Sequence, residues 1–84
     1  MKKIINRKIY DTETAKVVFN EWKRPPNRPG EREFEDILYL KTNGEFFLVD
    51  DELSFHPLPK ELAREWLEVR SDAETYLKYF EAEE

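Results

Sequence analysis

The chain has no cysteine, one histidine and only two glycines among its 84 residues. The lack of cysteine excludes a disulfide scaffold and a thiolate-ligated zinc or iron–sulfur site. The single histidine, His56, excludes a site built from several histidines, and two glycines are too few for a Gly-rich phosphate-binding loop. We therefore expect neither a metal nor a cofactor.

Long hydrophobic runs are also missing. No stretch approaches the roughly 20 apolar residues that a membrane helix needs, and the two isoleucines after Lys2-Lys3 are too few for the core of a signal peptide. The sequence predicts a cytoplasmic protein without a membrane partner. It also lacks a Ser-His-Asp order or another catalytic set, so we expect a protein that is not an enzyme.

Aromatic and charged residues are abundant instead. The aromatic share is 14 % and the charged share is 39 %, with a formal net charge of −5. Each aromatic ring buries roughly 150–250 Å² of surface, which helps so small a chain to build a core. We expect a single domain over residues 1–84, too small to enclose a deep cleft between domains.

Strands are expected in the first half of the chain. Residues 16–23 have strong strand preference, and the proline-rich segment 24–30 ends that strand. Residues 3–10 are expected to form a short strand or a tight hairpin. A turn is expected over residues 11–14, where Asp and Thr side chains can bond nearby backbone N–H groups.

The clearest local pattern is Asn43-Gly44 between two apolar runs, which is typical of a hairpin with a two-residue turn. This turn predicts that Leu40 faces Phe47 and that Leu38 faces Val49. The sheet then has two apolar faces, one with Leu38, Leu40, Phe47 and Val49, the other with Ile37, Tyr39, Phe46 and Leu48. Either helices and the N-terminal segment cover the two faces, or one face binds a partner.

Two helices are expected at the end of the chain. Residues 60–69 follow two prolines and carry Leu62, Trp66 and Val69 on one stripe, with Ala63 and Leu67 beside it. We expect Trp66 to be a buried anchor against the sheet. Ser71-Asp72-Ala73-Glu74 is typical of a capping box that starts a second helix, which has Ala73, Leu77 and Phe80 inside. The predicted fold is α+β: an antiparallel sheet of about three strands with two C-terminal helices packed on one face.

Charge is distributed unevenly along the chain. Residues 1–30 hold eight basic and three acidic side chains, a balance of +5, whereas residues 31–84 hold sixteen acidic and six basic ones, a balance of −10. An acidic surface of this kind either keeps the protein soluble or faces a basic partner. The carboxylates that we expect to contact a partner are Asp50, Asp51, Glu52, Glu61, Glu65, Glu68, Asp72 and Glu74.

The sequence is also compatible with two alternative binding modes. A protein could dock by apolar contact on the aromatic sheet face, through Tyr39 and Phe46. The basic N-terminal segment could instead bind nucleic acid through phosphate contacts and stacking. The residues of that surface would be the cations Lys2, Lys3, Arg7, Lys8, Lys23, Arg24 and Arg28, with the rings of Tyr10 and Trp22. A sequence pI near 5.0 argues against direct nucleic-acid binding, because such domains usually carry net positive charge.

Three segments resemble small acidic proteins of bacterial mobile elements. Residues 8–15, KIYDTETA, are similar to their K-x-Y-D-T-[ED]-T-A opening, and the hairpin around Asn43-Gly44 is similar to their L-Y-x-T-x-x-G-x-[YF]-F-L stretch. The helix segment 63–68 adds a third similarity. The proline-rich segment 24–30 departs from the pattern, and Thr42 comes one place late.

This resemblance implies a function in inhibition. Small acidic phage and plasmid proteins of this size include anti-CRISPR inhibitors, some of which mimic DNA. By that analogy, we expect a protein that presents carboxylates to a basic surface of a nucleic-acid-handling complex, for example a CRISPR effector complex. A row of carboxylates on a rigid helix can occupy a groove built for phosphates.

Overall fold

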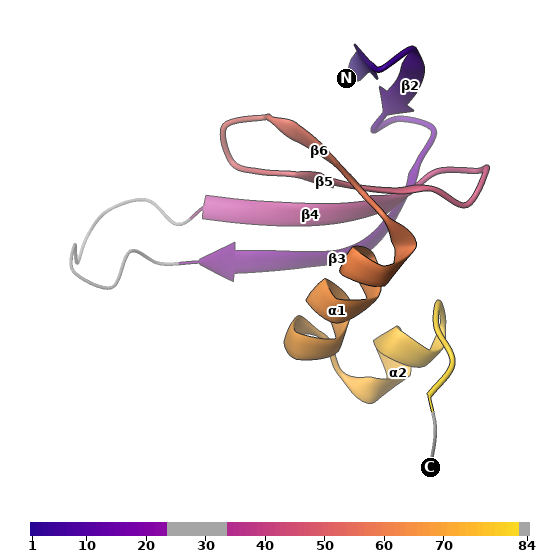
Figure 1. The fold of residues 1–84 in the computed structure, drawn as a ribbon. Coiled ribbons are helices and arrows are strands. Elements are labelled where there is room, and N and C mark those ends of the chain that lie inside the picture. The colour runs from indigo at the N-terminus through magenta and orange to yellow at the C-terminus, as the bar shows by residue number, and fades with distance from the viewer. Residues whose placement is uncertain (24–33, 83–84) are drawn as a thin grey trace.

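The computed structural model describes residues 1–23 and 34–82, and Figure 1 shows their arrangement. A sheet lies in the middle, with two helices on one side and an N-terminal hairpin on the other. The elements in chain order are β1 (Lys2–Ile5), β2 (Lys8–Asp11), β3 (Lys16–Lys23), β4 (Phe34–Leu40), β5 (Phe46–Val49), β6 (Phe55–Leu58), α1 (Lys60–Arg70) and α2 (Ala73–Leu77).

The prediction of one sheet of about three strands is wrong. The described residues form a two-stranded sheet, β1-β2, and a four-stranded sheet in the order β3-β4-β5-β6. Strand β6 was not predicted because it contains Pro57, and proline has no backbone N–H to donate to a neighbouring strand. Proline is tolerated there because β6 is an edge strand, with one side that pairs with no other strand among residues 1–23 and 34–82.

The N-terminal segment folds as the tight hairpin. Asn6 and Arg7 between β1 and β2 have φ angles of 51° and 67°, the positive values of a two-residue hairpin turn. The turn predicted after β2 is also confirmed, because the Asp11 side chain accepts a hydrogen bond from the backbone N–H of Glu13 at 3.0 Å. The hairpin therefore leads directly into β3.

Strand β3 has the predicted bounds, Lys16–Lys23. Its register against β4 shifts between Val17 and Phe19, so Val18 is an extra residue in a β-bulge. The bulge turns both Val18 and Phe19 toward the helices, where they join one hydrophobic cluster. The proline-rich segment predicted to end this strand lies outside the described residues.

The hairpin between β4 and β5 lies where it was predicted, but its register is wrong by one residue. Tyr39 faces Phe47 and Leu40 faces Phe46. Only Gly44 in this turn has a positive φ, 92°, and the Lys41 N–H donates to the Glu45 carbonyl at 2.8 Å. The loop is therefore the three-residue form, a tight turn followed by one left-handed residue. Because side chains alternate along a strand, this slip moves every β5 side chain to the opposite face.

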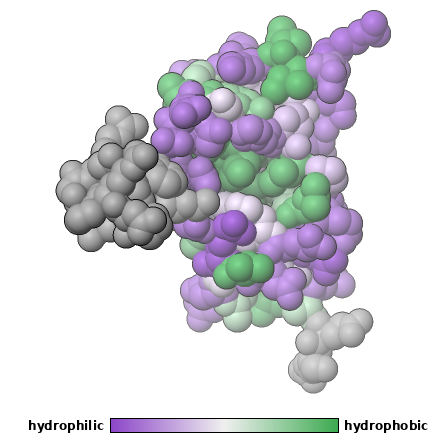
Figure 2. All heavy atoms as spheres, turned by 60° about the vertical axis from the view of Figure 1, so that its left-hand side comes forward, coloured by the Kyte–Doolittle hydropathy of each residue, from purple (hydrophilic) through white to green (hydrophobic). Residues whose placement is uncertain are grey.

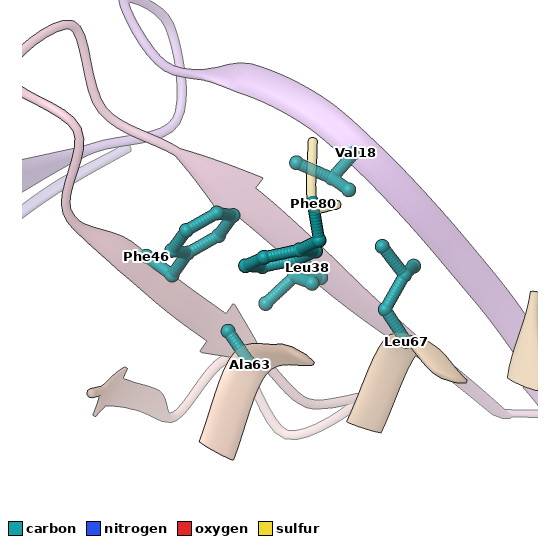
Figure 3. Packing of buried hydrophobic residues seen from close by; sticks show 6 residues of the cluster. All are labelled: Val18, Leu38, Phe46, Ala63, Leu67 and Phe80. Carbon is teal, nitrogen blue, oxygen red and sulfur yellow. The ribbon is translucent and has the colours of Figure 1, made fainter. Parts of the chain in front are cut away.

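One face of the four-stranded sheet packs against the helices. We call this cluster the helix-side core: Val18, Leu38, Phe46, Ala63, Leu67 and Phe80. Figure 3 shows these side chains pointing toward one another from the strands, from α1 and, for Phe80, from the segment that follows α2. The rings of Phe46 and Phe80 stack with centroids 5.4 Å apart.

The other face packs against the N-terminal hairpin. The hairpin-side core consists of Tyr10, Tyr39, Phe47, Val49 and Phe55. The helices thus cover one face of the sheet and the N-terminal hairpin packs on the other, which is the first of the two alternatives predicted for the two apolar faces. The short hairpin covers only part of its face, and a groove lined by Met1 and Thr12 on one side and by residues of β3, β4 and the β5–β6 turn on the other lies next to it.

The two helices lie in the predicted segments, but the residues that face the core differ from the predicted ones. Leu62 and Val69 are 51 % and 80 % exposed, and the pair Ala63 and Leu67 packs on the sheet instead. Trp66 is half-buried rather than a buried anchor. Its ring meets Phe19 edge-on at 6.1 Å, so it lies at the margin of the helix–sheet contact.

The second helix starts one residue later than the predicted capping box. Asp72, not Ser71, is the N-cap, and its carboxylate accepts a hydrogen bond from the Thr75 N–H at 2.9 Å. The Ser71 hydroxyl donates back to the Leu67 carbonyl at 2.8 Å. Ala73 and Leu77 are exposed, so Phe80 alone of the predicted inner residues reaches the core.

Candidate protein-binding surfaces

Three of the predicted carboxylates lie on the outer face of α1. Because Ala63 and Leu67 turn one side of the helix toward the sheet, residues on the other side face solvent. Glu61, Glu65 and Glu68 are spaced four and three residues apart on that side, and all are exposed. With Asp72 and Glu74 at the start of α2, they form what we call the helical acidic face.

The two arginines of α1 neutralise only part of the negative charge on the helical acidic face. Arg70 points toward β3, where its Nε lies 2.7 Å from a Glu21 carboxylate oxygen and its guanidinium stacks over Trp66. Arg64 is half-buried and pairs with Glu61 at 2.6 Å, which raises the pKa of the arginine. Glu65 and Glu68 have no ion-pair partner among the described residues.

The start of α2 continues the acidic face. The hydrogen bonds from Thr75 hold the pKa of Asp72 below its ordinary value, so this N-cap is charged at neutral pH. Asp72 and Glu68 line one open depression of about 740 Å³ between the two helices, together with Glu81. Glu74 is exposed in the first turn of α2.

Apolar side chains run beside the carboxylates on the same helix. Leu62 and Val69 lie next to Glu65 on the outer side of α1, where the sequence pattern had placed them inside. Isolated exposed apolar residues are common on protein surfaces. Here Leu62 and Val69 add apolar surface to the acidic face, and a protein partner can bury that surface. A row of charges alone would offer no such apolar contact.

The remaining predicted carboxylates lie on a different side of the molecule. Asp50, Asp51 and Glu52 form the turn between β5 and β6, and two of them line a groove on the hairpin-side face, opposite α1. Asp50 has a structural role, because its carboxylate accepts hydrogen bonds from the N–H groups of Ser54 and Glu52 and lies 2.9 Å from His56 Nε2. The contact with His56 is the main cause that lowers the pKa of Asp50, and the hydrogen bond from the Ser54 N–H is the next. The eight carboxylates therefore form two groups, a helical row and a turn cluster, and the two lie on opposite sides of the sheet rather than near each other.

The alternative docking face through Tyr39 and Phe46 is wrong. The corrected register places these residues on opposite faces of the sheet, and they are only 9 % and 5 % exposed. Phe46 stacks on Phe80 and Tyr39 stacks on Phe47, with centroids 5.0 Å apart. Both rings belong to the cores and are covered by the protein itself.

A groove that the sequence did not predict lies on the hairpin-side face. It encloses about 410 Å³, and we call it the Leu53 groove. Its apolar lining includes Trp22, Ile37, Val49 and Leu53, and its carboxylates are Glu35, Asp50 and Asp51. Hydrophobic side chains reach the surface between hydrophilic ones on the side of the molecule seen in Figure 2. The sequence predicted Trp22 as a strand residue and as a stacking residue of the basic N-terminal segment, but not its place beside Leu53 in this groove.

Several basic residues of the N-terminal segment are engaged within the fold. Lys8 Nζ lies 2.8 Å from Glu45 Oε2, Lys3 lies over the Phe55 ring, and Lys16 lies over the Tyr79 ring. Arg24 and Arg28 of the proposed nucleic-acid surface lie outside the described residues. The described part of that segment therefore offers fewer free cations than its sequence suggests.

The comparisons with known proteins add no relative. No family model matches the chain, and neither a curated protein nor a solved structure matches it. Within residues 1–23 and 34–82, no three His, Cys, Asp or Glu side chains are grouped so that they could hold a metal ion. None of the helices in this part of the chain has the length and apolar character needed to cross a membrane.

Proposed function

We propose that the protein is a non-enzymatic inhibitor that binds a basic surface of a nucleic-acid-handling complex through its helical acidic face. A CRISPR effector complex is the example that the resemblance to mobile-element proteins favours. The observation that supports this proposal is the orientation of charge on α1. Glu65 and Glu68 face solvent without an ion-pair partner among the described residues, while Arg70 is drawn toward the sheet.

The mechanism is competition for a groove that otherwise binds phosphates. A helix anchored to a sheet holds its carboxylates at fixed spacing, with roughly 5–6 Å between the Cβ atoms of residues four apart. Lysines and arginines of the partner exchange their counterions for these carboxylates, as they do for nucleic acid. Leu62 and Val69 add apolar contact beside the charges. A target of this kind acts in the cytoplasm, and the proposal includes that location.

The proposal is tested by displacement of labelled DNA from a purified CRISPR effector complex. The parent protein is compared with the triple variant Glu61→Lys, Glu65→Lys and Glu68→Lys at increasing salt. We expect the variant to inhibit at least tenfold less well, because like charges then face the basic groove. Inhibition by the parent should weaken as salt rises from about 0.05 to 0.3 M, since screening shortens the reach of exposed charges.

A matched control carries the same charge change on the other side of the sheet. Glu13→Lys, Asp51→Lys and Glu52→Lys together change the net charge equally and leave the structural Asp50 in place. This control should inhibit like the parent, and circular dichroism should show both variants folded. Equal inhibition by the α1 triple variant, or inhibition that does not depend on salt, would contradict the acidic-face mechanism.

A further inference from the structure

The turn between β5 and β6 contains a residue that does not suit its backbone. In the β4–β5 turn, the N–H of Gly44 donates to the Lys41 carbonyl at 3.0 Å, and in the β5–β6 turn the N–H of Leu53 donates to the Asp50 carbonyl at 3.0 Å. The two turns therefore have the same form. Gly44 supplies the positive φ in the first turn, whereas Leu53 has a φ of 63° in the second. Branched, bulky side chains disfavour this left-handed region.

Burial does not compensate for this strain. The Leu53 side chain is 54 % exposed and forms part of the wall of the Leu53 groove. Trp22, on the neighbouring side of the groove, is 60 % exposed. Two large apolar side chains thus stand at a groove that already has Ile37 and Val49 among its lining residues, and the described part of the chain leaves both largely exposed.

The charge of the groove indicates what can cover them. The side chains in the lining that carry full charge at neutral pH are the carboxylates Glu35, Asp50 and Asp51. The Met1 ammonium also lies in the lining, but it is engaged within the fold, where it donates to the Thr12 hydroxyl at 3.1 Å and lies 3.9 Å from a Glu13 carboxylate oxygen. Asp50 is engaged in its turn and Glu35 accepts a hydrogen bond from Asn20, but the Asp51 carboxylate has no partner among the described residues. The Glu35 charge also adds to burial in raising the pKa of Tyr39, so the Tyr39 hydroxyl in the lining stays protonated.

We propose that the Leu53 groove binds a protein segment that carries an apolar side chain next to a lysine or arginine. The apolar side chain packs between Trp22 and Leu53, and the cation reaches the Asp51 carboxylate at the rim. Lysine and arginine suit this arrangement because their aliphatic stems cover apolar surface while the charged end stays in water. This surface lies on the opposite side of the sheet from the helical acidic face, so the two can be tested independently.

The test uses NMR chemical shifts of the ¹⁵N-labelled protein with three blocked hexapeptides. The probe is acetyl-(Leu-Arg)₃-amide, and the two comparison peptides replace every leucine by serine or every arginine by glutamate. We expect the Leu-Arg peptide to shift the Trp22 indole N–H and the amides of Val49 and Leu53. Each comparison peptide should bind at least fivefold more weakly, because it lacks either the apolar or the cationic half.

Two variants make the result specific to the groove. Leu53→Asn keeps the turn, because asparagine tolerates a positive φ, and it should weaken binding at least fivefold without loss of folding. Asp51→Asn should weaken binding of the Leu-Arg peptide, whereas Glu68→Gln on α1 should not change it. Shifts confined to α1 and α2, equal binding of the Leu-Glu peptide, or unchanged binding by Leu53→Asn would each overturn the proposal.

Discussion

The ring of Tyr10 meets the ring of Phe47 edge-on, with centroids 5.4 Å apart and the planes at 72°. This contact joins the two-stranded hairpin to the centre of the four-stranded sheet. Lys41 lies over the Tyr10 ring at 4.4 Å from its centroid, and Lys8 pairs with Glu45 in the β4–β5 turn. The N-terminal hairpin is therefore held by the buried Tyr10 ring, by the partly buried Ile5 and by a few contacts of charged side chains.

Loss of the Tyr10 ring should release the hairpin. Tyr10 is buried, so Tyr10→Ala should lower the free energy of unfolding by about 3–5 kcal/mol, the range for large aromatic residues in cores. Ile9→Ala is the matched control, because Ile9 lies next to it on the exposed side of β2 and should cost under about 1 kcal/mol. Urea unfolding measures both, and similar losses for the two variants would contradict the docking described here.

The two leucines of α1 should differ strongly. Leu67 is fully buried in the helix-side core, so Leu67→Ala should cost about 2–5 kcal/mol. Leu62→Ala on the outer side should cost under about 1 kcal/mol. Thermal unfolding compares them. If Leu62→Ala proves the more damaging change, the inner face of the helix has been assigned wrongly.

Trp66 should fall between these two leucines. Its ring contacts Phe19 and Arg70 but is only half-buried, so Trp66→Ala should cost about 2 kcal/mol, below the range for fully buried rings. Trp66→Phe should recover part of the loss, because the contact with Phe19 is largely apolar. A loss for Trp66→Ala as large as that for Leu67→Ala would favour the buried anchor predicted from the sequence.

The sequence predicted segments better than faces. The bounds of β3 follow from strand-forming residues that run up to a proline-rich segment, and the structure has them at Lys16–Lys23. Asn43-Gly44 located the β4–β5 turn because few other residues adopt positive φ. In both cases a strong local preference, independent of packing, determined the result.

Which side chains of a strand or helix face the core depends on strand register and on tertiary contacts, and the local sequence does not determine either. A turn with one more residue exchanges Phe46 and Phe47 between the two cores, although the local sequence fits both turns. On α1, Leu62 and Val69 match a helical stripe as well as Ala63 and Leu67 do, and only the position of the sheet decides between them. The Leu53 groove was missed because it joins β3, β4 and the β5–β6 turn, which are distant in sequence.

The two matching turns should respond oppositely to substitution. A side chain at Gly44 meets no atom within 4 Å, so Gly44→Ala should lose about 1–2 kcal/mol through the backbone alone. Leu53→Asn relieves the strained φ and removes a largely exposed side chain, so it should gain up to about 1 kcal/mol. Thermal unfolding of both variants checks the prediction, and a clear loss for Leu53→Asn would mean that Leu53 stabilises the fold.

Acid should weaken the protein through Glu45. Hydrogen bonds from Lys8 and Asn43, at 2.8 and 2.6 Å, lower the pKa of Glu45 from 4.5 to about 2. A carboxylate with a lower pKa in the folded state binds more protons when unfolded. Its contribution to stability is therefore complete above about pH 4.5 and is lost as the pH falls toward about 2.

Variants of this ion pair should change the slope of stability against pH. Glu45→Gln removes the titrating group, so the free energy of unfolding should fall less steeply between pH 4.5 and 2 than in the parent. Lys8→Gln leaves the carboxylate but removes the first cause of its low pKa, so it should also reduce the slope, with the Asn43 hydrogen bond retained. Asp50, whose pKa is lowered by His56, should preserve some acid sensitivity in both variants. The measurement is urea unfolding at half-unit pH steps, and an unchanged slope in both variants would show that the Lys8–Glu45 contact does not stabilise the hairpin in solution.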